Sequence, residues 1–120
     1  MEPPNFGKTL KDILKLPIFG NKKIESCSKY LSKKDQRELF NMYVLSFMAT
    51  PTPSYNKVLE ILGIKDKVEK YTDENKDWKS KVKGSYYYFL RASVMINNEE
   101  CQEIVQTVLN QTRSRMKIDK

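Results

Sequence analysis

The clearest pattern in the sequence is a run of apolar side chains between residues 39 and 48. They recur three and four positions apart, the spacing that places side chains on one buried face of an α-helix. Ser32, followed three residues later by Asp35, is typical of a helix N-terminus, and Pro51 and Pro53 end the pattern. We therefore expect the central helix of the core here, with an inward face formed by Leu39, Phe40, Tyr43, Val44, Phe47 and Met48.

Capping residues mark the other helices. Thr9 caps a first helix that Pro17 ends, and Thr52 caps a later one that has Pro53 at its first position. Asn97 or Asn98 caps the last helix, whose early turns carry glutamates that suit the positive end of the helix dipole. These helices are predicted at residues 10–16, 53–62, 64–71, 72–84 and from residue 99 onward.

Residues 85–96 fit two structures. The run from Tyr86 to Leu90 consists of residue types favoured in strands, but Tyr86, Phe89, Leu90 and Ser93 also share one helical stripe. We favour a helix because the chain offers no evident second strand to satisfy the backbone hydrogen bonds. A strand here would have to pair with residues 17–26 or with a second copy of the chain, which would produce a homodimer.

Together these patterns predict a mainly α fold. We expect a compact single domain of five or six helices, with a short strand or hairpin near residues 18–30 or 85–96 as the alternative. Residues 1–7 contain two prolines and a glycine and are expected to form a flexible N-terminal arm. The globular domain then spans residues 8–116, and residues 117–120 form a basic C-terminal tail.

The charge pattern favours binding over catalysis. The 120 residues include 22 Lys and Arg, 15 Asp and Glu and no histidine, which gives a net charge of +7. The absence of histidine excludes Ser-His-Asp and Cys-His sites and removes the commonest metal ligand. The four glycines are too far apart to form a phosphate-binding loop. We therefore expect no enzyme activity, no metal and no cofactor.

Most of the excess positive charge lies in the first third of the chain and at its C-terminus. Residues 8–37 carry nine basic and three acidic side chains, a net charge of +6, whereas residues 65–83 are nearly balanced. Lysine is suited to phosphate contact without sequence readout. The leading hypothesis is therefore a nucleic-acid or other polyanion binder of low sequence specificity, contacting its partner through Lys8, Lys11, Lys15, Lys22, Lys23, Lys33, Lys34, Arg37, Arg113 and Arg115.

A cluster of aromatic residues supports a second hypothesis. Tyr86, Tyr87 and Tyr88 cannot all face the core, and Arg91 follows them closely. Exposed tyrosines supply large contact areas at protein interfaces. The alternative function is thus a protein-interaction module that uses Tyr86, Tyr87, Tyr88 and Arg91. Peripheral association with an anionic membrane through the lysines is the third hypothesis.

Two cysteines, Cys27 and Cys101, are too few for a disulfide framework or a zinc site. The chain also contains no apolar run long enough to span a membrane and begins without the features of a secretory signal. We expect an intracellular protein of the cytoplasm or nucleus, not a secreted one. Its size and charge are consistent with a viral or phage accessory protein.

Overall fold

The structure, a computed structural model, describes residues 4–20, 22 and 24–119. Its centre is α2 (Lys33–Ser46), in which every residue from Leu39 to Ser46 is buried. A helix that is apolar around its whole circumference has to be covered from all sides. The predicted central helix is therefore confirmed, and the other helices are arranged around it.

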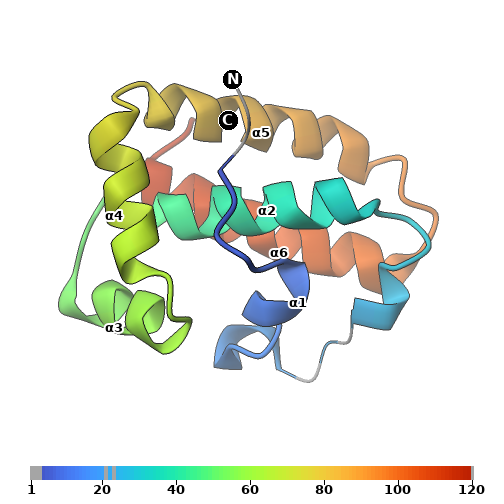
Figure 1. The fold of residues 1–120 in the computed structure, drawn as a ribbon. Helices are drawn as coiled ribbons and strands as arrows, with labels where there is room; N and C mark the ends of the chain where they lie inside the picture. The colour runs from blue at the N-terminus through green and yellow to red at the C-terminus, as the bar shows by residue number, and fades with distance from the viewer. Residues whose placement is uncertain (1–3, 21, 23, 120) are drawn as a thin grey trace.

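α5 (Trp78–Ser93) and α6 (Glu99–Met116) pack lengthwise against α2 and against each other (Figure 1). α6 runs in the same direction as α2, whereas α5 runs in the opposite direction. The C-terminal ends of α2 and α6 therefore meet beside the first turns of α5. The remaining elements in the described residues are α1 (Leu10–Ile13), η1 (Pro17–Phe19), η2 (Ile24–Ser26), α3 (Pro53–Ile61) and α4 (Lys65–Glu74).

Three of the predicted caps are present as hydrogen bonds. The Ser32 hydroxyl accepts from the Asp35 N–H at 3.0 Å, and the Thr52 hydroxyl accepts from the Tyr55 N–H at 3.1 Å. The Asn98 side-chain oxygen accepts from the Cys101 N–H at 2.9 Å, which selects Asn98 over its neighbour as the cap of α6. Each bond satisfies a backbone donor that the helix leaves free.

The mainly α prediction is confirmed, and the strand or hairpin alternative is wrong for the described residues of both segments. Residues 85–93 belong to α5, and the described part of residues 18–30 forms turns and 3-10 helices. Burial explains why residues 85–93 form a helix and not a strand. The inward stripe of α5 repeats every three or four residues and consists of Trp78, Val82, Tyr86, Phe89 and Ser93.

The predicted helix boundaries at 71–72 and 84–85 are also wrong. α4 continues to Glu74, and α5 passes through Gly84 without interruption. A glycine inside a helix costs only about 1 kcal/mol, and the buried stripe on both sides of Gly84 outweighs that cost. The actual break lies at residues 75–77, where Asn75 leaves the helical conformation and its side-chain amide donates to the Tyr71 carbonyl at 2.9 Å.

Both ends of the chain contribute to the core beyond the predicted limits of residues 8 and 116. Phe6 is buried and packs edge-on against the ring of Tyr71, and the Asn41 side-chain amide donates to the Pro4 carbonyl at 2.8 Å. Ile118 is buried at the other end. These contacts hold residues 4–6 against the domain instead of leaving them as a free arm. Burying one large apolar side chain contributes about 1.5–3 kcal/mol, enough to fix such a short segment.

Two glycines give a matched test of this fold. No atom lies within 4 Å of where a Cβ would stand at Gly84, so Gly84→Ala should stabilise the protein by about 0.5–1 kcal/mol. Gly63 has equal space but a φ of +73°, so Gly63→Ala should destabilise it by about 1 kcal/mol. Urea unfolding of both variants measures the difference. A loss of stability in Gly84→Ala would contradict a continuous α5.

Candidate anion-binding site

The side chain of Arg115, near the end of α6, is held against three aromatic rings. Its guanidinium carbon lies 4.2 Å from the ring centre of Phe47, 4.7 Å from that of Tyr43 and 5.0 Å from that of Tyr55. Nη2 donates to the Gln111 side-chain oxygen at 3.0 Å, and the Tyr43 hydroxyl lies 3.4 Å away. A cation over aromatic faces is stabilised by the negative potential of the rings.

No carboxylate among the described residues forms an ion pair with Arg115. Nε and Nη1 are buried and have no hydrogen-bond partner. The rings therefore fix the position of this cation without neutralising its charge. The positive charge of Arg115 therefore attracts negatively charged groups beside it.

A pocket of about 290 Å³ adjoins Arg115 where α2 and α6 end and α5 begins. Four of its lining residues are cationic and none is acidic. We call it the basic pocket, and it is lined by Ala49, Thr50, Lys79, Lys83, Arg115, Met116 and Lys117. Lys79 and Lys83 are four residues apart and so lie on the same side of α5.

The ends of the helices do not cancel this charge. The C-terminus of a helix carries about half a negative charge, so the ends of α2 and α6 together supply about one. Four cations against one negative charge leave an excess of roughly three positive charges at the pocket. Within a partly enclosed site, such an excess attracts an anion more strongly than it would on an open surface.

Lys117 has an unusual backbone. Among the described residues other than glycine, Lys117 is the one with a positive φ, 55°. Its N–H donates to the Ser114 carbonyl. The next N–H, that of Ile118, donates to the Arg113 carbonyl at 3.1 Å and closes the end of α6. Glycine is the usual residue at such a helix end, since a side chain there adds strain. A lysine at this place puts a cation at the pocket at the expense of stability.

A second pocket, of about 270 Å³, lies between the N-terminal segment, α2, α4 and α5. Its charged lining residues have both signs: Lys34 and Lys81 lie there with Glu38. Lys81 also lies 3.8 Å from the carboxylate of Asp77. The carbonyl oxygen of the buried Asn41 side chain has no partner in this region. With two lysines against Glu38 and the nearby Asp77, this pocket is a weaker candidate for an anion than the basic pocket.

The basic residues predicted from the first third of the chain do not join the basic pocket. The exposed ones lie on α1, just after α1 or on the first turns of α2, and they are Lys11, Lys15, Lys33, Lys34 and Arg37. Lys8 is half-buried. The 14 residues of α2, about 21 Å, separate its first turns from the end where the pocket lies. The structure thus places Lys33, Lys34 and Arg37 at the opposite end of α2 from the basic pocket.

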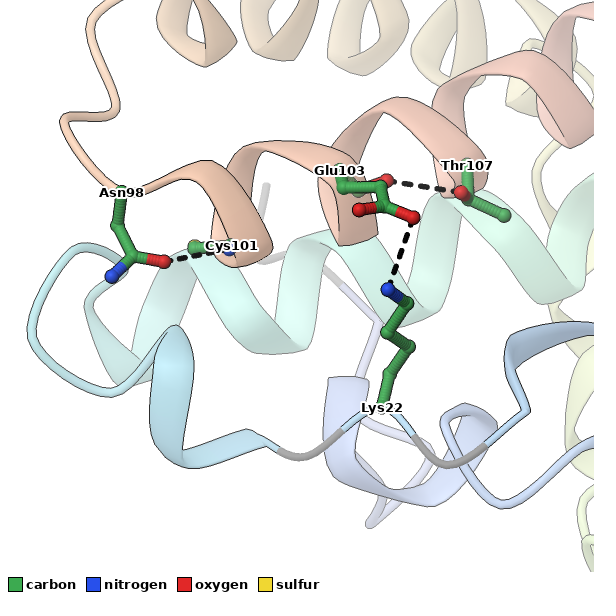
Figure 2. A network of polar contacts seen from close by, with 5 residues as sticks. All are labelled: Lys22, Asn98, Cys101, Glu103 and Thr107. Carbon is green, nitrogen blue, oxygen red and sulfur yellow. Dashed lines mark hydrogen bonds and ion pairs between the residues drawn. The ribbon is translucent and has the colours of Figure 1, made fainter.

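One predicted lysine is engaged within the protein. The Lys22 ammonium lies 3.0 Å from the carboxylate of Glu103 on α6, as Figure 2 shows. In Figure 2 the Thr107 hydroxyl also donates a hydrogen bond to the backbone carbonyl of Glu103. The same figure shows the Asn98 side chain accepting from the Cys101 N–H at the start of α6. The pair of Lys22 and Glu103 ties the segment before α2 to α6 and partly neutralises Lys22. Lys23 lies outside the described residues.

The predicted role of Arg115 needs correction. We expected it to contact phosphate directly, but two of its nitrogens are buried and the third bonds Gln111. It supplies charge to the pocket instead of free donors. Arg113 is half-buried one turn earlier. Lys79 and Lys83 were missed because residues 65–83 are nearly neutral as a whole, although their spacing of four places both cations on one helical face.

The structure buries one of the four residues predicted to form an interface and exposes the other three. Tyr86 is only 5% exposed and belongs to the core, so its assignment to an interface is wrong. The inward stripe of α5 requires this, since Tyr86 lies between Val82 and Phe89 on it. Tyr87, Tyr88 and Arg91 are exposed.

The two cysteines lie side by side in the core. The Cys27 thiol is 3.9 Å from the Cys101 carbonyl oxygen, and both residues are buried. Burial raises the pKa of both thiols, and contact with Cys101 raises the pKa of Cys27 further. Among the described residues no group of three or more Cys, Asp and Glu side chains is arranged to hold a metal ion.

Because the thiolate is the reactive form of cysteine, the raised pKa values predict that neither thiol reacts readily in the folded protein. A thiol-specific chromogenic reagent at about pH 8 should label both cysteines only as fast as the chain unfolds, and at once in denaturant. The unfolded chain releases these protons at lower pH than the folded one, so stability should also fall as pH rises above about 8.5. Rapid labelling of either thiol in the native protein would contradict this arrangement.

No protein-family model matches the chain, and no curated protein or solved structure shows significant similarity to it. Within the part of the chain that the structure describes, no helix has the length and apolar character needed to cross a bilayer. The function therefore has to be argued from the chemistry of the basic pocket and of the surfaces around it.

Proposed function

We propose that this chain is a non-enzymatic binding protein that engages a polyanion, nucleic acid in the first place, through the basic pocket. The observation that carries the proposal is the composition of that pocket, four cationic side chains and no acidic one. A volume of about 290 Å³ is at the lower end of the range for ligand pockets, which suits a short stretch of phosphate backbone from a longer chain. The net charge of +7 adds long-range attraction for such a partner.

The same geometry supports low sequence specificity. Reading a base edge requires a side chain with free, directed donors, most often an arginine with two parallel N–H groups. Arg115 has no such pair to offer, since Nε and Nη1 are buried and Nη2 is engaged. Lys79, Lys83 and Lys117 are point charges that contact phosphates of any sequence.

Paired lysine substitutions test the location of the site. We expect Lys79→Ala with Lys83→Ala to weaken the binding of a labelled single-stranded oligonucleotide equally for all sequences. The slope of log affinity against log salt should become shallower by about 1.4, because each lost phosphate contact removes roughly 0.7. Fluorescence anisotropy over a range of salt concentrations measures both effects.

The matched control is Lys11→Ala with Lys15→Ala, which removes the same charge from exposed positions on and next to α1. It should leave the slope almost unchanged. An equal loss in the control would assign binding to net charge alone and contradict the pocket. Binding to anionic vesicles without binding to the oligonucleotide would replace nucleic acid by a membrane as the partner.

Lys117→Gly separates binding from stability. Glycine relieves the positive φ at this position, so the variant should be more stable than the natural protein by about 1 kcal/mol. It also removes one of the four cations, so oligonucleotide affinity should fall and the salt slope should become shallower by about 0.7. Urea unfolding and anisotropy on the same sample test both expectations. Unchanged affinity would exclude Lys117 from the site.

A further inference from the structure

The outward face of α5 carries an unusual concentration of exposed apolar side chains. The described residues contain eight large apolar side chains that are exposed, and five of them lie between positions 87 and 95. Val94 is 69% exposed and Met95 82% exposed. We call this group the α5 patch, which consists of Tyr87, Tyr88, Leu90, Val94 and Met95.

Helical spacing makes the α5 patch continuous. Tyr87, Leu90 and Val94 are three and four residues apart and form one stripe. Val94 is the C-cap residue of α5 and Met95 lies in the turn that follows, so these two residues extend the patch past the end of the helix. Arg91 lies four residues after Tyr87 and next to Leu90, so its charge lies within the patch.

These side chains are not needed to attach α5 to the domain. The opposite face of the helix already packs against α2 and α6 through its buried stripe, which includes Val82, Tyr86 and Phe89. In Figure 1, α5 forms the upper edge of the bundle, with α2 and α6 on its lower side. A helix with apolar side chains on two opposite faces is usually covered by other structure on both of them.

The charges of α5 indicate what covers it. Residues 78–93 contain three lysines and one arginine but no acidic residue. A second copy of this chain would bring Arg91 and its neighbours against their own counterparts, and like charges oppose that pairing. Three of the five side chains of the patch are aliphatic and offer no ring for stacking bases, which disfavours nucleic acid.

We propose that the α5 patch docks an acidic amphipathic helix of a partner protein. Apolar residues of the partner, spaced three, four and seven apart, would pack against Leu90, Val94 and the tyrosine rings. Its carboxylates would meet Arg91 in the patch and Lys83, which lies one turn before Tyr87. Lys83 also lines the basic pocket, whereas the apolar residues of the α5 patch lie outside it.

A synthetic helical peptide with leucines on one face and glutamates on the other tests the proposal with the full chain. We expect saturable binding, with the largest backbone NMR shifts at residues 87–95. The same peptide with lysine in place of glutamate, and the acidic peptide in scrambled order, should not bind. Absence of binding by the acidic peptide, or equal binding by either of the other two, overturns the proposal.

Substitutions locate the peptide on the protein. Val94→Ser with Met95→Ser removes exposed side chains and should weaken peptide binding at least tenfold, with little change in thermal stability. Ile61→Ser on α3 is the matched control, because Ile61 is also exposed, at 72%, and lies outside the patch. Equal weakening by both variants overturns the proposal.

Arg91→Glu distinguishes charge from hydrophobic contact and should weaken binding mainly at low salt. Its failure to alter peptide affinity at low salt would overturn the acidic character assigned to the partner. Oligonucleotide binding by Val94→Ser with Met95→Ser should remain as in the natural protein, so that loss of this site and loss of the basic pocket can be told apart. Concentration-dependent self-association of the natural chain that these serines abolish would replace the partner helix by a second copy.

Discussion

The second half of α2 has no polar face, so the other elements of the chain have to cover it on all sides. α5 and α6 cover most of it, and α1 and α4 contact it as well. Buried polar groups on α2 are few: Ser46 donates to the Tyr43 carbonyl in the same helix, and Asn41 donates to the distant Pro4 carbonyl. Because this half of α2 needs covering on all sides, even the segment before α1 is drawn into the core.

The same helix determines where the charge gathers. The rings of Tyr43 and Phe47 at the end of α2, with Tyr55 stacked on Phe47, form the surface against which Arg115 lies. α6 runs in the same direction as α2, so their C-terminal ends come together and are joined by the first turns of α5. The basic pocket is thus a consequence of core packing: aromatic residues of the core and its edge hold a cation that no carboxylate among the described residues neutralises.

Sequence alone predicted the elements whose determinants are local. Ser32, Thr52 and Asn98 mark helix starts through hydrogen bonds that span three residues, and the apolar repeat of α2 needed no knowledge of its neighbours. The boundary at Gly84 was misplaced because local propensity was weighed without the tertiary burial of Tyr86 and Phe89. Phe6 was assigned to the flexible arm and Ile118 to the basic tail for the same reason, since each is a single apolar residue in a polar stretch.

The candidate site could not be assembled from the sequence. Lys79 and Lys83 are separated from Arg115 by more than 30 residues. The parallel packing of α2 and α6 brings these three residues together, and no short sequence pattern signals that packing. The count of basic residues instead favoured the first third, where Lys22 is paired with Glu103 and the exposed lysines share no pocket of one charge. Tyr87, Tyr88 and Arg91 were recognised as exposed because four neighbouring aromatic rings cannot all face inward on a helix.

The most direct test of this account is an NMR titration of the full chain with a short single-stranded oligonucleotide at low salt, following the backbone amides. We expect the largest shifts at Thr50, Lys79, Lys83 and Lys117, which come from three separate parts of the chain and lie together at the basic pocket. Much smaller shifts are expected at Lys11, Lys15 and Lys33. Largest shifts on α1 and the first turns of α2, with none at the basic pocket, would contradict the account.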